Sequence, residues 1–281
     1  MPNKAFLEIT NACNLACSFC HGTRRSIKYM NTDEFTRAAT EARTFADFLY
    51  FHLMGEPLLH PKLGEFFDIA NALGFKVIIT TNGTLLPKCA EILLSAKALY
   101  KVSISLHSFE ANAKEYNMDD YLKGCFDFCK AATEKGIISV LRLWNNGGSD
   151  TLNGDIIRQM HVFFDDGVTE WKETYSGYKI KDKVFLEWGD KFDWPDMDAE
   201  FCGDSHSCYG LRDQIGILSD GTVVPCCLDA DGVINLGNIF TTPLSEILSS
   251  ERATSLRRSF HTRRITEPLC QRCGYAKMKK Y

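Results

Sequence analysis

The sequence predicts an α/β fold: a partial (β/α)6 barrel followed by a small C-terminal domain made of a β-hairpin plus a helix. Over the first two thirds of the chain, short apolar segments alternate with amphipathic ones, which is typical of parallel strands joined by crossover helices. Five or six such units are visible, fewer than the eight of a closed barrel. The alternation stops near residue 190, where the composition changes.

Six segments are predicted as strands because they are short, apolar and rich in β-branched residues. They are residues 4–10, 47–54, 76–81, 100–106 and 137–143, with 182–188 as a weaker sixth. Amphipathic patterns predict helices at 32–44, 62–74, 86–98, 118–136 and 155–164. The first helix follows Asn31 with acidic residues in its first turn, and the second ends at Gly74.

The C-terminal part has a different organisation. Residues 214–227 are predicted as a hairpin, since Ser-Asp-Gly separates two apolar runs. Residues 241–260 are predicted as one helix with Pro243 near its start. We therefore expect two units, residues 1–195 and residues 196–281.

Composition narrows the class of protein. The chain has 281 residues, of which 45% are hydrophobic and 24% charged, with a net charge of −4. These values allow a large core and give no evident nucleic-acid-binding surface. No apolar run approaches the ~20 residues that span a bilayer, and the N-terminus lacks the pattern of a secretory signal. We expect a cytoplasmic protein with no membrane association.

Twelve cysteines are present, and most gather at two places. Cys13, Cys17 and Cys20 have the spacing C-x3-C-x2-C and follow the first strand, at the end where barrel active sites gather. A [4Fe-4S] cluster held by three thiolates keeps one iron open for a further ligand. The alternative is a zinc site with the adjacent His21 as the fourth ligand.

The triad and the motifs after it resemble the radical S-adenosylmethionine (SAM) superfamily, in which SAM binds the open iron and is cleaved to a 5′-deoxyadenosyl radical. Met54 to Pro57 resembles the GGEP motif of the superfamily, with Met54 in place of the first glycine. Arg142 lies inside an apolar strand, so its charge needs a partner. The SAM carboxylate is one option, and a structural salt bridge is an equal alternative. The resemblance implies that seven residues contact SAM: Phe19, Met54, Gly55, Glu56, Asn82, Ser105 and Arg142.

A second cysteine group lies near the C-terminus and suits zinc or an iron–sulfur cluster. The stretch from Cys208 through GILSDGTVVPCC to CQRC resembles the twitch domain, a shortened relative of the SPASM domain. That resemblance implies one auxiliary [4Fe-4S] cluster held by Cys208, Cys226, Cys270 and Cys273. Because Cys227 is adjacent to Cys226, the choice between these two stays open.

Strand alternation also suggests residues that face the substrate. The candidates for this role are Glu8, His52, His107 and Trp144, with Tyr50 beside them, and each has a structural role as its alternative. A carboxylate inside a strand, as at Glu8, must find a cation or hydrogen-bond donors, and a substrate amine is one option.

The expected function is hydrogen abstraction from a small-molecule substrate, with reduced flavodoxin or ferredoxin as the electron donor. The whole-chain pattern also resembles small twitch proteins that include the queuine lyases, and acidic and aromatic residues around the pocket suit a cationic, planar substrate. We therefore favour cleavage of queuine to its aminomethyl-deazaguanine precursor. The alternatives are a radical alcohol dehydrogenase, a peptide or sulfatase maturase, and a zinc-stabilised binding module without enzymatic activity.

Overall fold

Six parallel strands form an open barrel. A computed structural model describes residues 4–112, 117–167 and 170–278. The strands are β1 (Lys4–Leu7), β2 (Phe48–Tyr50), β3 (Lys76–Thr81), β4 (Leu99–Ser105), β5 (Ile138–Asn146) and β8 (Val184–Asp190). Each pairs in parallel with the next in this order. The predicted α/β fold is confirmed, including its weaker sixth strand.

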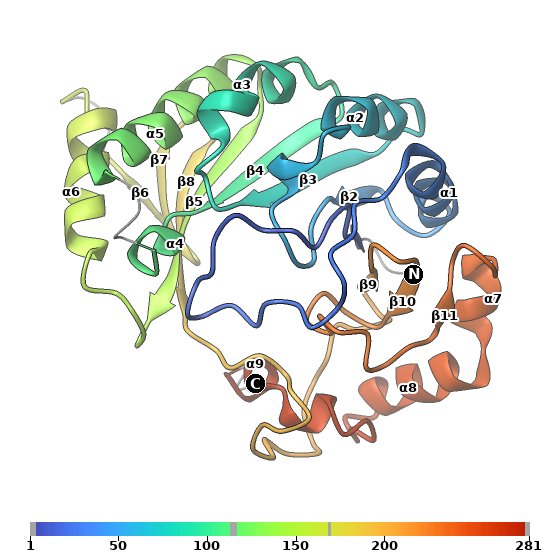
Figure 1. Cartoon of the computed structure of the whole chain (residues 1–281). Coiled ribbons are helices and arrows are strands. Elements are labelled where there is room, and N and C mark those ends of the chain that lie inside the picture. The colour runs from blue at the N-terminus through green and yellow to red at the C-terminus, as the bar shows by residue number, and fades with distance from the viewer. Residues whose placement is uncertain (1–3, 113–116, 168–169, 279–281) are drawn as a thin grey trace.

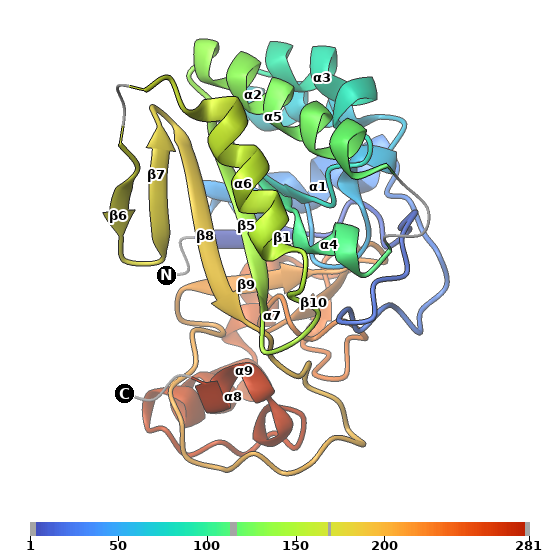
Figure 2. The ribbon, with the colours of Figure 1, turned by 90° about the vertical axis from the view of Figure 1, so that its left-hand side faces the viewer.

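Helices cover the outer face of this sheet (Figures 1 and 2). They are α1 (Thr32–Arg43), α2 (Leu63–Ala72), α3 (Leu86–Ser95), α5 (Met118–Glu134) and α6 (Asn153–Phe164). The outward strand residues and the apolar helix faces form the main core, in which Phe35 stacks on Phe66 with centroids 4.1 Å apart. Asn31 and Glu34 form a capping box that fixes the start of α1.

Short segments connect these elements near the carboxyl ends of the strands. The 3-10 helix η1 (Pro57–Leu59) follows β2, and α4 (His107–Glu110) follows β4. β2 is shorter than predicted, because the chain leaves the sheet after Tyr50. β5 is longer than predicted and extends to Asn146, so Trp144 lies within the strand.

The sheet continues beyond the barrel on both sides. On one side, β7 (Gly177–Lys181) and β6 (Lys172–Thr174) add an antiparallel hairpin to β8 that the sequence did not predict. On the other side, the predicted hairpin is present as β9 (Gln214–Ile217) and β10 (Thr222–Val224), followed by β11 (Gly237–Asn238). Because β9 pairs in parallel with β1, the described sheet has the order β11-β10-β9-β1-β2-β3-β4-β5-β8-β7-β6.

The C-terminal helices lie on the side of the barrel beyond β9 and β10 (Figures 1 and 2), and the first of them contacts α1, where the Leu244 amide donates to Glu41 Oε2 at 3.0 Å. They are α7 (Leu244–Ser249), α8 (Glu251–His261), η2 (Cys270–Arg272) and α9 (Gly274–Met278). The single helix predicted over 241–260 is wrong: Ser250 leaves the helical conformation and its side chain caps α8 by accepting from the Ala253 amide. The unit boundary near residue 195 stays a prediction, since the sheet extends across it.

The inner face of the sheet is more polar than the outer face. Its apolar cluster is small and is formed by Phe6, Leu53, Met54, Leu218, Val224 and Ala230. In the described part of the chain, no helix has the length and apolar character needed to cross a membrane.

Candidate functional site

The loop between β1 and α1 carries the first cysteine group and lies between α4 and the β9–β10 hairpin (Figures 1 and 2). Each sulfur of the group faces an N–H donor. The pairs are Asn82 Nδ2 with Cys13 at 4.0 Å, Asn112 Nδ2 with Cys17 at 3.1 Å, and the Gly22 amide with Cys20 at 3.4 Å. Burial raises the pKa of the Cys17 thiol to about 11. Because N–H donors stabilise metal-bound sulfur, this donor set fits an iron–sulfur cluster.

Glu8 does not face a substrate. Its side chain is fully buried, and both carboxylate oxygens lie 2.7 Å from Arg25 Nη2. The Met54 amide, the Ser219 amide and the Ser219 hydroxyl donate to the same carboxylate. The cation that a buried carboxylate requires is therefore Arg25, within the chain, and not a substrate amine.

C-terminal residues hold the cysteine loop in place. His21 Nε2 lies 2.9 Å from Asp231 Oδ2, and the Arg24 amide donates to Asp231 Oδ1 at 3.1 Å. Arg25 Nε donates to the Ala230 carbonyl at 2.9 Å. His21 is therefore occupied by Asp231, which disfavours it as the fourth ligand of a zinc site. Sequence reasoning missed Arg25 and Asp231, although the buried carboxylate of Glu8 signalled that a cation was needed.

Among the described residues, no three His, Cys, Asp or Glu side chains converge on the position of a single metal ion. The thiolates of a four-iron cluster each bind a different iron. Cysteines that hold such a cluster therefore need not converge on one point.

The Gly55–Glu56 turn packs directly on the cysteine loop. Gly55 has a φ of +77°, and a Cβ there would lie 2.5 Å from the Thr10 carbonyl oxygen. The Glu56 amide donates to the Ala12 carbonyl at 2.7 Å. These contacts bring the backbone of the predicted SAM motif beside Cys13.

The Glu56 side chain is directed into the protein. Its carboxylate is 1% exposed and accepts from the Leu58 amide at 3.1 Å and from the Asn82 amide at 2.7 Å. Burial raises the pKa of Glu56 to about 7. Glu56 thus links the turn after β2 to the end of β3, where the Asn82 side chain bonds Asn14 of the cysteine loop at 3.0 Å.

Ser105 and Arg142 are register partners on β4 and β5. Arg142 Nε lies 3.4 Å from Glu187 Oε2, and its guanidinium is 4.5 Å from the centroid of the Trp144 ring. Arg142 Nη1 donates to the Thr80 hydroxyl at 3.4 Å. The structural salt bridge considered for Arg142 is therefore present, with Glu187 as its partner.

Two histidines near the site are held neutral by their surroundings. His52 Nδ1 accepts from the Thr80 amide at 3.2 Å, and burial lowers the pKa of His52 to about 3. Burial also lowers the pKa of His107 to about 4, and its ring packs on Phe19 with centroids 4.7 Å apart. His107 thus contacts the cysteine loop, whereas His52 faces the inside of the barrel.

A cavity of about 430 Å³ joins the inner face of the barrel to the C-terminal cysteines. His52, Arg142 and Trp144 line its barrel end, while Glu8 and His107 are not part of its lining. The opposite end is lined by the second cysteine group: Cys208, Cys226, Cys270 and Cys273.

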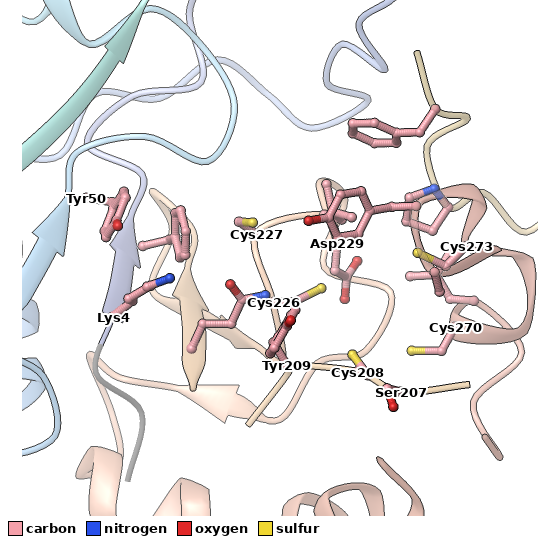
Figure 3. Close-up of a pocket in the computed structure, with 18 of the residues that line it drawn as sticks. Lys4, Tyr50, Ser207, Cys208, Tyr209, Cys226, Cys227, Asp229, Cys270 and Cys273 are labelled. Atoms are coloured by element: carbon pink, nitrogen blue, oxygen red, sulfur yellow. The ribbon is translucent and has the colours of Figure 1, made fainter. Parts of the chain in front are cut away.

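Figure 3 shows the sulfurs of this second group around one space, while the sulfur of Cys227 lies apart, toward Tyr50. The Gly210 amide donates to Cys208 Sγ at 3.3 Å, so this group also has an N–H donor. Burial, with smaller repulsion from Cys208 and other thiols, raises the pKa of Cys226 well above its usual value. This arrangement fits a cluster on the four cysteines and favours Cys226 over Cys227.

Comparisons with known proteins agree with this geometry. The model of the radical SAM superfamily matches residues 7–148, and the model of SPASM, an iron–sulfur cluster-binding domain, matches residues 208–274. The chain is 27% identical over 269 residues to a probable GTP 3′,8-cyclase of Methanococcus vannielii, covering 85% of this chain and 88% of that protein. It is 30% identical over 137 residues to an AdoMet-dependent heme synthase of Methanosarcina barkeri, covering 47% and 38%.

Solved structures share the fold at low identity. BtrN in complex with AdoMet and 2-DOIA has a TM-score of 0.57 at 18% identity, with 97% of this chain and 93% of that chain covered. The protein anSMEcpe with bound AdoMet has a TM-score of 0.63 at 14% identity, with 99% and 84% covered. A radical SAM domain carries a [4Fe-4S] cluster and SAM, and a SPASM domain carries auxiliary iron–sulfur centres. The chain belongs to the radical SAM superfamily and has a C-terminal SPASM-type domain.

Proposed function

We propose that this radical SAM enzyme abstracts a hydrogen atom from a small molecule bound in the cavity between the barrel and the second cysteine group. The observation that carries the proposal is that one cavity is lined both by inward strand residues and by Cys208, Cys226, Cys270 and Cys273. Its volume of about 430 Å³ falls within the roughly 300–1,000 Å³ of small-molecule sites. A [4Fe-4S] cluster held by Cys13, Cys17 and Cys20 together with SAM would supply the radical chemistry, with flavodoxin or ferredoxin as the reductant.

We assign the SAM-binding cluster to Cys13, Cys17 and Cys20, and one auxiliary [4Fe-4S] cluster to the four C-terminal cysteines. The N–H donors that face the sulfurs support both assignments. For SAM itself, the backbone at Gly55 and the side chain of Asn82 are the best supported contacts, since both lie against the cysteine loop. Ser105 and Phe19 remain proposals that depend on the family resemblance.

Inside the cavity, the residues of the chain can hold and orient a substrate. The Trp144 ring, fixed under the Arg142 guanidinium, offers a flat surface for a planar group. The neutral His52 imidazole, just after β2, and the Glu187 carboxylate on β8 offer hydrogen-bonding groups from two separate parts of the lining.

Queuine cleavage is our specific lyase proposal. Trp144 and Tyr50 suit the planar base, and Glu187 and Asp229 are carboxylates of the lining. The charge argument for a cationic substrate is weaker than the sequence suggested, because Glu8 is paired internally and the lining includes cationic side chains.

A radical alcohol dehydrogenase is the second candidate. Oxidation of an alcohol to a carbonyl removes a hydrogen atom, a further electron and a proton, so it needs an electron acceptor near the substrate. The four cysteines that would hold the auxiliary cluster line the same cavity as the substrate residues. This shared lining favours a redox role for the second group.

The test is anaerobic reconstitution followed by incubation with SAM, dithionite and either queuine or a panel of small alcohols. We expect about eight irons per chain and substrate-dependent release of 5′-deoxyadenosine, measured by mass spectrometry. Cys17→Ser should abolish the release, while Cys89→Ser, outside both cysteine groups, should preserve it. Bound zinc without iron would contradict the radical mechanism, and lack of the aminomethyl base would exclude queuine cleavage.

A further inference from the structure

Three cationic side chains line the barrel end of the cavity. They are Lys4 on β1, Lys101 on β4 and Arg142 on β5. Their side chains come from the inner face of one curved sheet and are near enough to interact: after burial, repulsion from Arg142 and Lys4 contributes to a lowered pKa of Lys101. Like charges gathered in a partly dry cavity repel, unless an anion lies between them.

The carboxylates of the region do not balance these charges. Glu187 pairs with Arg142. Glu8, on the same face of the sheet, is occupied by Arg25. Asp229, at the other end of the cavity, accepts from the amides of the Val233–Ile234 turn.

Among the described residues, Lys4 and Lys101 form no ion pair or hydrogen bond through their side chains, although Glu187 also attracts the Lys101 ammonium from a distance. At the barrel end, three cations thus face a single carboxylate, Glu187. A partly buried ammonium group without a close protein partner is costly, and a ligand that carries negative charge would offset this cost. This cost applies to Lys101, which is half-buried, whereas Lys4 is exposed and would add its charge from the rim of the cavity.

We propose that Lys4, Lys101 and Arg142 form a subsite for an anionic group, a phosphate or a carboxylate, on the substrate of this cavity. The inference rests on the proposed function, since it names the chemical class of the substrate. The anion would lie at the barrel end, and the rest of the molecule would extend along Trp144 toward the second cysteine group. A substrate with a net positive charge is disfavoured, so this inference counts against queuine and in favour of the second candidate, the oxidation of an alcohol that also carries an anionic group.

The competing explanation is that the lysines balance the negative charge of thiolates in the auxiliary site. Lys4 lies close enough to Cys227 to favour its thiolate, although burial dominates and raises the pKa of Cys227 to about 12. Under this explanation, removing Lys101 changes the reduction potential of the auxiliary cluster and leaves anion binding undetectable in every variant.

The test uses reconstituted holoenzyme and two probes, inorganic pyrophosphate for the phosphate class and citrate for the carboxylate class. Binding is measured by isothermal titration calorimetry at constant ionic strength, because salt screens exposed charges. Lys101→Met is compared with Lys76→Met. Lys76 is a matched control, since it starts the neighbouring strand β3 but lies over the rings of Phe48 and Tyr100, outside the cavity lining.

We expect at least one probe to bind the wild type and Lys76→Met equally, and to bind Lys101→Met about tenfold or more weakly, as for loss of a charge-assisted hydrogen bond. The probe that binds identifies the anion class. Equal binding to Lys101→Met and wild type, or no binding of either probe, would overturn the inference. Should Lys101→Met not assemble its clusters, Lys4→Met carries the same comparison.

Binding does not require SAM cleavage, so the two proposals fail separately. A holoenzyme that binds pyrophosphate with the expected variant pattern, yet releases no 5′-deoxyadenosine with any substrate, would support the subsite and count against the proposed hydrogen abstraction. A shifted auxiliary potential in Lys101→Met without anion binding would assign the lysines to the cluster instead.

Discussion

Breaking the Glu8–Arg25 pair should be one of the most destabilising single changes in the cysteine loop. Replacing Arg25 with Met keeps most of the apolar stem and removes the charge. Glu8 is fully buried, so the substitution leaves an uncompensated carboxylate, for which losses of about 3–5 kcal/mol are typical. Because the Met54 amide and two Ser219 donors still reach Glu8, we expect the lower end, about 3 kcal/mol.

The assay is urea-induced unfolding followed by circular dichroism, with Arg24→Met as the matched control. Arg24 is the adjacent residue and also contacts carboxylates, but its side chain is 64% exposed, so its loss should cost at most about 1 kcal/mol. Adding Glu8→Gln to Arg25→Met should recover part of the loss, because the buried charge is then gone. Equal destabilisation by the Arg24 and Arg25 variants would refute the reasoning.

Three further predictions test other parts of the site. Cys226→Ser should lower the iron content of the reconstituted protein from about eight toward about four per chain, whereas Cys227→Ser should leave it unchanged; iron loss in Cys227→Ser but not in Cys226→Ser would exchange the two assignments. The pKa of His52 is lowered to about 3 from its usual 6.5. The neutral ring therefore contributes stability that is fully present above pH 6.5 and is lost as the pH falls toward 3. Between pH 6.5 and pH 5, the free energy of unfolding should drop by about 2 kcal/mol more in the wild type than in His52→Gln. Gly55→Ala should destabilise the protein by at least about 2 kcal/mol in the same unfolding assay, because of its positive φ and the Thr10 carbonyl; a near-neutral effect would show that the turn can move.

The alternation of apolar strands and amphipathic helices predicted the barrel because the helices must cover the apolar outer face of the sheet with their own apolar faces. The β6–β7 hairpin was missed, since its residues are largely polar and exposed and carry no apolar alternation. The break between α7 and α8 was missed because Ser250 acts through a cap, which overrides an otherwise continuous helical pattern.

Site residues could be predicted from the sequence where a residue type has one dominant role in proteins. The cysteine groups belong to this class: their spacing predicts the two cluster sites, and the individual ligands stay predictions. The partner of Glu8 was not predictable, because an inward carboxylate can be satisfied by a substrate or by any nearby cation. Arg25 lies 17 positions away, and only the folded path of the loop brings it to the strand.

The two cysteine groups are connected through one sheet rather than through a flexible link. β1 leads into the loop of the first group, and β9, paired with β1, leads through the hairpin to Cys226. The buried carboxylate of Glu8 bonds the cysteine loop at Arg25, the predicted SAM motif at Met54 and the β9–β10 hairpin at Ser219. A hinge between two separate units would let these three segments drift, whereas a shared buried carboxylate requires them to move together. Glu8 therefore fixes how the cysteine loop sits on the hairpin that leads to the cavity, and this structural role leaves its charge unavailable to the substrate.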